Sequence, residues 1–276
     1  MFCMSNNTMV ITILLRMLNK VFGRRLSNYY LSKGVDYLNH GDIVNAIKWL
    51  KISINADPDD IEAIFCLSTI YADQGKYDEE FALLTKALSI NPKGEKLLYN
   101  LAIGHENKGD IEAAIRCYKE VLKYNPTHIN SLNNLGLLYH KKRLYDEAIT
   151  LYKAALSKNP RDATVLYNMG NTLMDMGNIN ESINYYKRAI ELQPNYAYAY
   201  GNLGNAQSKA GLLNEAINNY KRTISLDEGN PLPHYNLAIV YLKKEMFDEA
   251  LAEFKIAASM GHEGAKKELE YRQDNA

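Results

Sequence analysis

Apolar residues recur along most of this chain at spacings of three and four, which is the periodicity of one helix face. Leu132, Leu135 and Tyr139 form one such stripe, and Ala148 and Tyr152 belong to the next. Polar residues fill the positions between them and mark the solvent side of each segment. The pattern therefore predicts an all-α chain, built from many short helices joined by tight turns.

Prolines mark where these helices end. Five of them are spaced 34 residues apart: Pro58, Pro92, Pro126, Pro160 and Pro194. Proline in a helix interior removes a backbone hydrogen bond and clashes with the preceding turn, so each one indicates a break between helices. A fixed period of this length is typical of a repeat array. One pair of helices cannot bury its apolar faces alone, so the pairs are expected to stack.

Counting each proline as position 32 divides the chain into seven repeats. They span 27–60, 61–94, 95–128, 129–162, 163–196, 197–230 and 231–264. Position 8 is small in every repeat and position 20 in all but one, which lets two helices approach closely. Large residues at positions 17 and 24 fill the space around that contact. Each repeat is therefore predicted to be a helix, a turn and a second helix.

The turn inside each repeat carries a glycine in five cases: Gly41, Gly75, Gly109, Gly177 and Gly211. Glycine adopts the left-handed conformation that commonly ends a helix, without steric cost. Arg143 and Glu245 stand at this place in the other two repeats. There we expect tighter turns that stay in the right-handed region.

Two further residues depart from the pattern. Glu80 occupies position 20 of the second repeat, where an unpaired buried charge would be costly. We expect its side chain to reach outward to water and the local packing to be looser. Glu228 replaces the sixth proline, but Gly229, Asn230 and Pro231 follow it and end the helix equally well.

The pattern resembles the tetratricopeptide repeat, a helix-turn-helix of 34 residues. The residues that match it in the fourth repeat are Leu132, Leu135, Gly136, Tyr139, Ala148, Tyr152 and Pro160. The resemblance implies an α-solenoid, a right-handed superhelix in which the first helix of each repeat lines the concave surface. It also resembles the repeat portion of O-GlcNAc transferases, without the catalytic domain that follows the repeats in those enzymes. Residues 265–276 are expected to form a C-terminal capping helix.

Composition argues against several classes of function. The 32 basic and 32 acidic residues balance, whereas nucleic-acid binders usually show a basic excess or stripe. Cys3, Cys66 and Cys117 have no metal-like or redox spacing and fit reduced thiols in a cytoplasmic protein. The phosphate-binding, nucleophile-elbow and zinc-protease motifs are missing. We therefore expect no enzyme activity, no cofactor, no metal and no nucleic-acid partner.

A column of asparagines becomes visible when the repeats are aligned. Position 6 holds Asn100, Asn134, Asn168, Asn202 and Asn236; Asn171 and Asn205 stand at position 9, and Tyr99, Tyr167 and Tyr235 at position 5. The asparagine amide carries both a donor and an acceptor, so it can pair with an extended peptide backbone. Tyrosines beside it would add amphipathic contact area. Duplication of an asparagine-bearing repeat on a solvated face would leave the same column.

The hypothesis that follows is a non-enzymatic scaffold, binding an extended peptide of a partner protein in the concave groove through this column. Acidic and basic groove residues balance, which argues against a strongly charged ligand. The alternative is a structural scaffold that self-assembles as a homo-oligomer at a membrane or organelle surface.

Residues 1–26 do not fit the repeat. Apolar residues between Val10 and Phe22 are interrupted by Arg16 and Lys20, too early for a membrane-spanning helix. Two interpretations stay open: a helix that covers the exposed face of the first repeat, or a basic amphipathic anchor that touches a membrane surface through residues 10–25.

Overall fold

The structure, a computed structural model, describes the backbone of residues 6–274 and the side chains of residues 22–272. The described chain is entirely helical apart from turns, in agreement with the predicted all-α repeat solenoid. It divides after Pro126 into two compact blocks. We call them the N-terminal block and the C-terminal block and describe each by itself.

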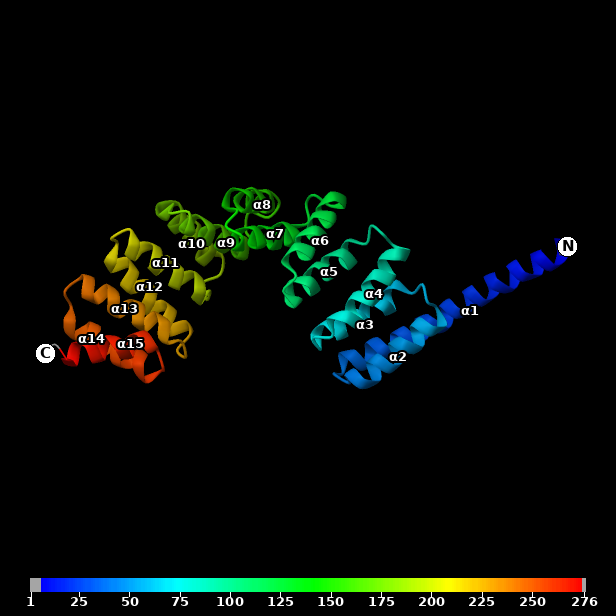
Figure 1. Ribbon diagram of the computed structural model, residues 1–276, viewed down its shortest axis with the longest axis horizontal. Coiled ribbons are helices and arrows are strands. Elements are labelled where there is room, and N and C mark those ends of the chain that lie inside the picture. Colours follow the sequence, from blue (N-terminus) through cyan, green and yellow to red (C-terminus); the bar gives the residue numbers. More distant parts are fainter. Residues whose placement is uncertain (1–5, 275–276) are drawn as a thin grey trace. The chain divides into compact units, whose positions relative to one another are not determined.

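The N-terminal block holds three helix pairs. Its helices are α1 (Asn6–Asn39), α2 (Ile43–Ala56), α3 (Ile61–Asp73), α4 (Tyr77–Ile90), α5 (Glu95–Lys108) and α6 (Ile111–Tyr124). Each helix packs against the next, and α3 also contacts both α1 and α5. The first helices of successive repeats therefore lie side by side along one face of this block (Figure 1).

The C-terminal block holds four helix pairs and a final helix. They are α7 (Ile129–Lys141), α8 (Tyr145–Lys158), α9 (Ala163–Asp175), α10 (Ile179–Leu192), α11 (Ala197–Lys209), α12 (Leu213–Leu226), α13 (Pro231–Lys243), α14 (Phe247–Ser259) and α15 (Glu263–Asp274). Here too the first helices α7, α9, α11 and α13 contact one another in order. Each of the five periodic prolines lies in the break between one pair and the next, as predicted.

Close contact between a small and a large residue holds each pair together in the C-terminal block. A Cβ added to Gly136, Gly170 or Gly204 would lie 2.6 to 2.9 Å from the ring of the tyrosine at position 24 of the same repeat. Those three tyrosines are almost completely buried: Tyr152, Tyr186 and Tyr220. The predicted pairing of small position 8 with large position 24 is confirmed.

All seven turns inside the repeats have a residue with positive φ, including the two without glycine. Arg143 has a φ of 60° and Glu245 a φ of 61°. The expectation of right-handed turns at these two places was wrong. The chain needs the left-handed residue to reverse direction between paired helices, and the packing of the flanking helices outweighs the steric cost of a Cβ there.

Glu80 also differs from the prediction. Its side chain does not reach water: only 2% of the residue is exposed, and its Oε2 has no hydrogen-bond partner. The carboxylate fills the space left by Gly104 on α5, where a Cβ would lie 2.8 Å from either oxygen. Burial, with a smaller contribution from Asp73, raises the pKa of Glu80 to about 7. The missing side chain at Gly104 makes room for Glu80, and the raised pKa favours its neutral form.

The chain ends differ in their packing. Before Ser27 there is no separate helix, because α1 continues through the described part of segment 1–26 into the first repeat. At the other end, α15 packs on α14, with Ala265 fully buried and Leu269 in the same apolar cluster. Residues 1–5 and 275–276, which belong to the two predicted terminal segments, lie outside the described residues. Within the described chain, no helix has the length and apolar content needed to cross a bilayer.

Candidate functional site

A hollow of about 530 Å³ lies on the first-helix face of the C-terminal block. Asparagine is the most frequent residue in its lining, and we call it the amide hollow. It is lined by His140, Asn171, Met174, Asp175, Tyr186, Asn202, Asn205, Ser208, Lys209, Tyr220, Asn236, Ile239 and Lys243. Four of the ten residues predicted to bind peptide are therefore brought together here.

Hydrogen bonds tie the amides of neighbouring repeats to each other. Asn171 Oδ1 accepts from the hydroxyl of Tyr186 at 2.8 Å and from Asn202 Nδ2, in the next repeat, also at 2.8 Å. The following repeats contain the same arrangement. Asn205 Oδ1 accepts from the hydroxyl of Tyr220 at 2.7 Å and from Asn236 Nδ2 at 3.2 Å.

This arrangement, which we call the amide relay, has a physical reason at its buried end. A tyrosine hydroxyl that is taken out of water is costly to leave unpaired, and for Tyr186 and Tyr220 the asparagine at position 9 supplies the acceptor. Burial raises the pKa of Tyr186 and of Tyr220, so both remain protonated donors. The asparagine at position 6 of the next repeat uses the second lone pair of the same oxygen.

Part of the hydrogen-bonding capacity of the relay remains for a ligand. Among the described residues, neither Nδ2 of Asn171 nor Oδ1 of Asn236 has a hydrogen-bond partner. Asn202 Oδ1 accepts only a long bond of 3.4 Å from Asn205. Asn171, Asn202 and Asn236, which carry these free or weakly used atoms, all line the hollow.

The other predicted asparagines are placed differently. Asn168 is only 8% exposed and donates to Asn133 Oδ1 at 2.9 Å, so it joins two repeats beneath the surface. Asn134 is half-buried and accepts from Asn133 Nδ2 at 3.3 Å. Asn100 lies half-buried on α5, in the N-terminal block. None of the three lines the amide hollow.

The three predicted tyrosines pack against other rings rather than lining the hollow. Tyr167 lies with its ring centroid 4.9 Å from that of Tyr196, and its hydroxyl accepts from Asn202 at 3.0 Å. Tyr235 stacks on His262 at 4.3 Å. Tyr99, in the N-terminal block, lies 5.8 Å from Tyr118.

Charged residues of both signs border the amide hollow. Asp175 lies 3.4 Å from Nε2 of His140, a histidine whose pKa is lowered by burial. Lys243 donates to the hydroxyl of Ser208 at 3.0 Å, and Lys209 is exposed. Reasoning from sequence did not select His140 or the tyrosines at position 24 as part of the site. The tyrosines could have been found, because an unpaired buried hydroxyl is costly and the asparagines at position 9 are suitable acceptors for Tyr186 and Tyr220.

The N-terminal block has a hollow of its own, of about 680 Å³, with a different lining. Phe65 and Cys66 occupy the places that hold glycine and asparagine in the sixth repeat, and Glu62, Glu95 and Lys96 surround them. Burial raises the pKa of the Cys66 thiol, which keeps it protonated and unreactive. Among the described residues no group of histidine, cysteine or carboxylate side chains could hold a metal ion.

Comparison with known families identifies the repeats. Models described as tetratricopeptide or TPR repeats match residues 61–93, 99–163, 170–211 and 209–245. The crystal structure of MamA aligns at 31% identity and a TM-score of 0.56, over 60% of this chain and 97% of that one. The chain belongs to the tetratricopeptide repeat family.

Other tetratricopeptide structures agree in fold. A tetratricopeptide repeat protein from Parabacteroides merdae ATCC 43184 aligns at 24% identity and a TM-score of 0.67, over 88% of this chain and 97% of its own. YrrB, whose structure is described as a TPR protein with an unusual peptide-binding site, aligns at 24% identity and a TM-score of 0.57, over 65% and 93%. A search of curated proteins found no match. The resemblance to O-GlcNAc transferase arrays stays a prediction.

Proposed function

We propose that the C-terminal block binds an extended segment of a partner protein across the amide hollow. The fold is that of a protein-interaction scaffold, and the observation that supports this finer proposal is the amide relay. The relay holds Asn171, Asn202, Asn205 and Asn236 in fixed orientations, so their remaining donor and acceptors are ordered before a ligand arrives. Such preorganisation lowers the entropy lost on binding.

The polar surface continues from the amide hollow into a second hollow, which favours an extended ligand over a compact one. A second, smaller hollow of about 100 Å³ shares Asn202, Asn205, Tyr220 and Asn236 with the amide hollow. It adds the exposed apolar side chains of Tyr198 and Leu232. A peptide crossing from one hollow to the other would meet the asparagines with its backbone and these two residues with a side chain.

The charges around the hollow limit the kind of peptide. Lys209 and Lys243 lie in the same lining as Asp175, so the surface carries both signs within a short distance. Electrostatic complementarity therefore favours a polar segment of mixed or low net charge over a strongly acidic or basic one. YrrB, with its peptide-binding site, supports the view that this fold can carry such a function.

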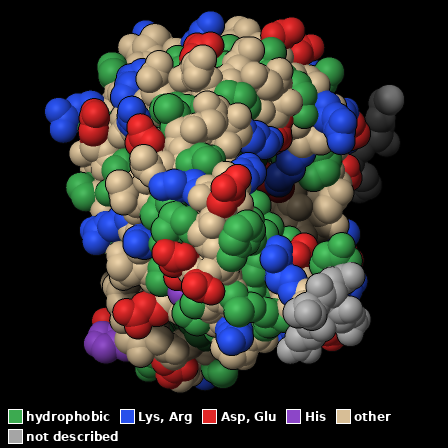
Figure 2. All heavy atoms as spheres, turned by 90° about the vertical axis from the view of Figure 1, so that its left-hand side faces the viewer, with side chains coloured by type: hydrophobic (Ala, Val, Ile, Leu, Met, Phe, Trp, Pro, Cys, Tyr) green, Lys and Arg blue, Asp and Glu red, His purple; other side chains and the backbone are tan. Residues whose placement is uncertain are grey.

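The alternative function is self-assembly, and the described surface at the C-terminal end of the chain lacks the large apolar patch that would favour it (Figure 2). Figure 2 shows hydrophobic side chains interspersed with acidic and basic ones on that face. A surface that associates with itself usually gathers its apolar residues in one patch.

The proposal is tested with peptides selected from a displayed library against the full chain. Replacing Asn236→Leu keeps the side-chain volume but removes the amide, and costs the fold one hydrogen bond of 3.2 Å. We expect this substitution to lower the affinity for the selected peptides about tenfold, as measured by fluorescence anisotropy. The matched control is Asn218→Leu on the exposed side of α12, which should leave the affinity unchanged.

Circular dichroism of both variants verifies that they are folded. Selected peptides that bind the Asn236→Leu variant as tightly as the parent chain would show that the amide hollow is not the binding surface. Failure of the library to yield any binder would contradict the proposed function itself.

A further inference from the structure

Helix α1 carries an exposed apolar stripe on the side turned away from the repeats. Phe22, Leu26 and Tyr29 follow one another at spacings of four and three, and they are 61%, 50% and 55% exposed. Ser27 and Gly34, on the other side of the same helix, are buried against α2. Tyr29 contacts Tyr30 and Lys33 of the same helix, and all three stripe residues remain at least half exposed.

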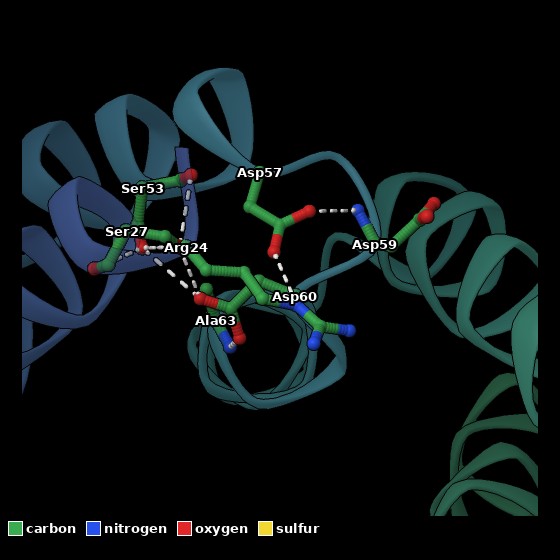
Figure 3. A network of polar contacts seen from close by, with 7 residues as sticks. All are labelled: Arg24, Ser27, Ser53, Asp57, Asp59, Asp60 and Ala63. Carbon is green, nitrogen blue, oxygen red and sulfur yellow. Dashed lines mark hydrogen bonds and ion pairs between the residues drawn. The ribbon is translucent and has the colours of Figure 1, made fainter. Parts of the chain in front are cut away.

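A set of close contacts fixes the orientation of α1. Gly23 lies so near the end of α2 that a Cβ would come within 2.6 Å of the carbonyl oxygen of Ala56. The hydroxyl of Ser27 lies 2.8 Å from that of Ser53 and also donates to the carboxylate of Asp60 (Figure 3).

Arg24 adds an ion pair at the same place, with its Nε 3.6 Å from Asp57 Oδ2. Since polar contacts and close backbone packing hold one side of α1, the opposite side, with the stripe, is kept facing outward.

The backbone of α1 is helical from Asn6 onward, and the sequence before Phe22 is rich in apolar residues. Charge in this region has one sign. Arg16, Lys20, Arg24 and Arg25 are basic, and the first acidic residue of the chain is Asp36.

We propose that α1 lies on an anionic membrane surface through this stripe. A basic helix with one apolar side is attracted to anionic lipid while its apolar residues enter the interface. Phe22 and Tyr29 are aromatic residues, which favour the interface between lipid headgroups and acyl chains. A second copy of the chain fits less well, because two copies of α1 would bring basic residues together without acidic ones to pair with them.

Vesicle co-sedimentation of the full chain tests the proposal. The probes are vesicles of phosphatidylcholine alone, and of phosphatidylcholine mixed with phosphatidylglycerol. We expect binding to the anionic vesicles, and a loss of more than tenfold for the double variant Phe22→Gln, Leu26→Gln. The control double variant is Leu212→Gln, Phe247→Gln, whose residues are 41% and 61% exposed in the C-terminal block. It should bind like the parent chain.

A charge variant distinguishes electrostatic attraction to anionic lipid from nonspecific hydrophobic adsorption. Arg25→Gln removes one exposed charge and should weaken binding to anionic vesicles about fivefold, with no effect on binding to phosphatidylcholine alone. The proposal is overturned if the parent chain ignores anionic vesicles, or if the Phe22→Gln, Leu26→Gln variant binds them equally well. It is also overturned if light scattering shows that the parent chain is a dimer and that the Phe22→Gln, Leu26→Gln variant is a monomer. The stripe would then be the contact with a second copy of the chain.

Discussion

The two blocks follow the same repeat of 34 residues, but they pair their helices with different residues. In the C-terminal block, three of the four repeats have glycine at position 8 and tyrosine at position 24, and the last has Ala238 and Phe254. In the N-terminal block the pairs vary: Gly34 with Leu50, Ser68 with Leu84 and Ala102 with Tyr118. The fold thus requires one small and one large residue at this contact and leaves their identity open.

The choice of tyrosine changes the surface as well as the core. Leu50 and Leu84 end inside the N-terminal block and call for no polar partner. Tyr186 and Tyr220 end in hydroxyls, which recruit asparagines and so build the amide relay. A difference in core packing therefore produces the different hollows of the two blocks.

The largest expected effect comes from removing a tyrosine at position 24. Tyr186→Ala should destabilise the C-terminal block by about 3–5 kcal/mol, because it leaves a cavity and removes the donor to Asn171. Urea unfolding monitored by circular dichroism measures the change. Tyr198→Ala, at a residue that is 67% exposed, is the control. Equal effects of the two variants would refute the central role of the buried ring.

Glu80 gives the N-terminal block a pH dependence. Its pKa is raised by burial from 4.5 to about 7, so the folded chain binds the proton more tightly than the unfolded chain. The contribution to stability is complete below the unfolded pKa and is lost as the pH rises through the folded pKa, an effect on the order of 3 kcal/mol.

Urea titrations at acidic and at mildly basic pH should show this loss. Glu80→Gln cannot ionise, so its stability should vary much less over the same range. Glu79→Gln, at the exposed neighbour, should behave like the parent chain. A parent chain whose unfolding free energy does not fall with rising pH would contradict the buried carboxylate.

A smaller effect is expected from the relay itself. Tyr220→Phe removes one of the two donors to Asn205 and should cost about 1 kcal/mol. A double-mutant cycle with Asn236→Leu should then give a coupling energy of at least about 0.5 kcal/mol, because both residues bond the same oxygen. Strict additivity of the two changes in urea unfolding would show that the relay does not act as a unit.

The smallest expected effect concerns the turns. Arg143→Gly should stabilise the C-terminal block by about 0.5–1 kcal/mol, since glycine relieves the left-handed strain of a φ of 60° but gains freedom in the unfolded chain. Gly75→Ala places a side chain at a φ of 69° and should destabilise the N-terminal block by a similar amount. Thermal unfolding measures the change in stability of each variant. Changes of the same sign in the two variants would contradict the role of positive φ.

Sequence periodicity was sufficient for the helices, their breaks and the small–large pairing, because all three depend on local pattern. It was insufficient for Glu80, whose burial depends on Gly104 in a different repeat. It also did not distinguish Asn202 from Asn168, since both stand at position 6 of their repeats. Whether an amide reaches the surface depends on its neighbour, here Asn133, which no column of similar residues reveals.

Asp60 limits how freely the repeats can be exchanged. Its Oδ1 accepts from the backbone of Ala63 at 3.0 Å and so caps α3, while its Oδ2 accepts from the hydroxyls of Ser27 and Ser53. A repeat boundary drawn at Ile61 therefore separates α3 from Asp60, its N-cap residue. Anyone who transplants the second repeat into another array should carry Asp60 along and supply two hydroxyls from the repeat before it.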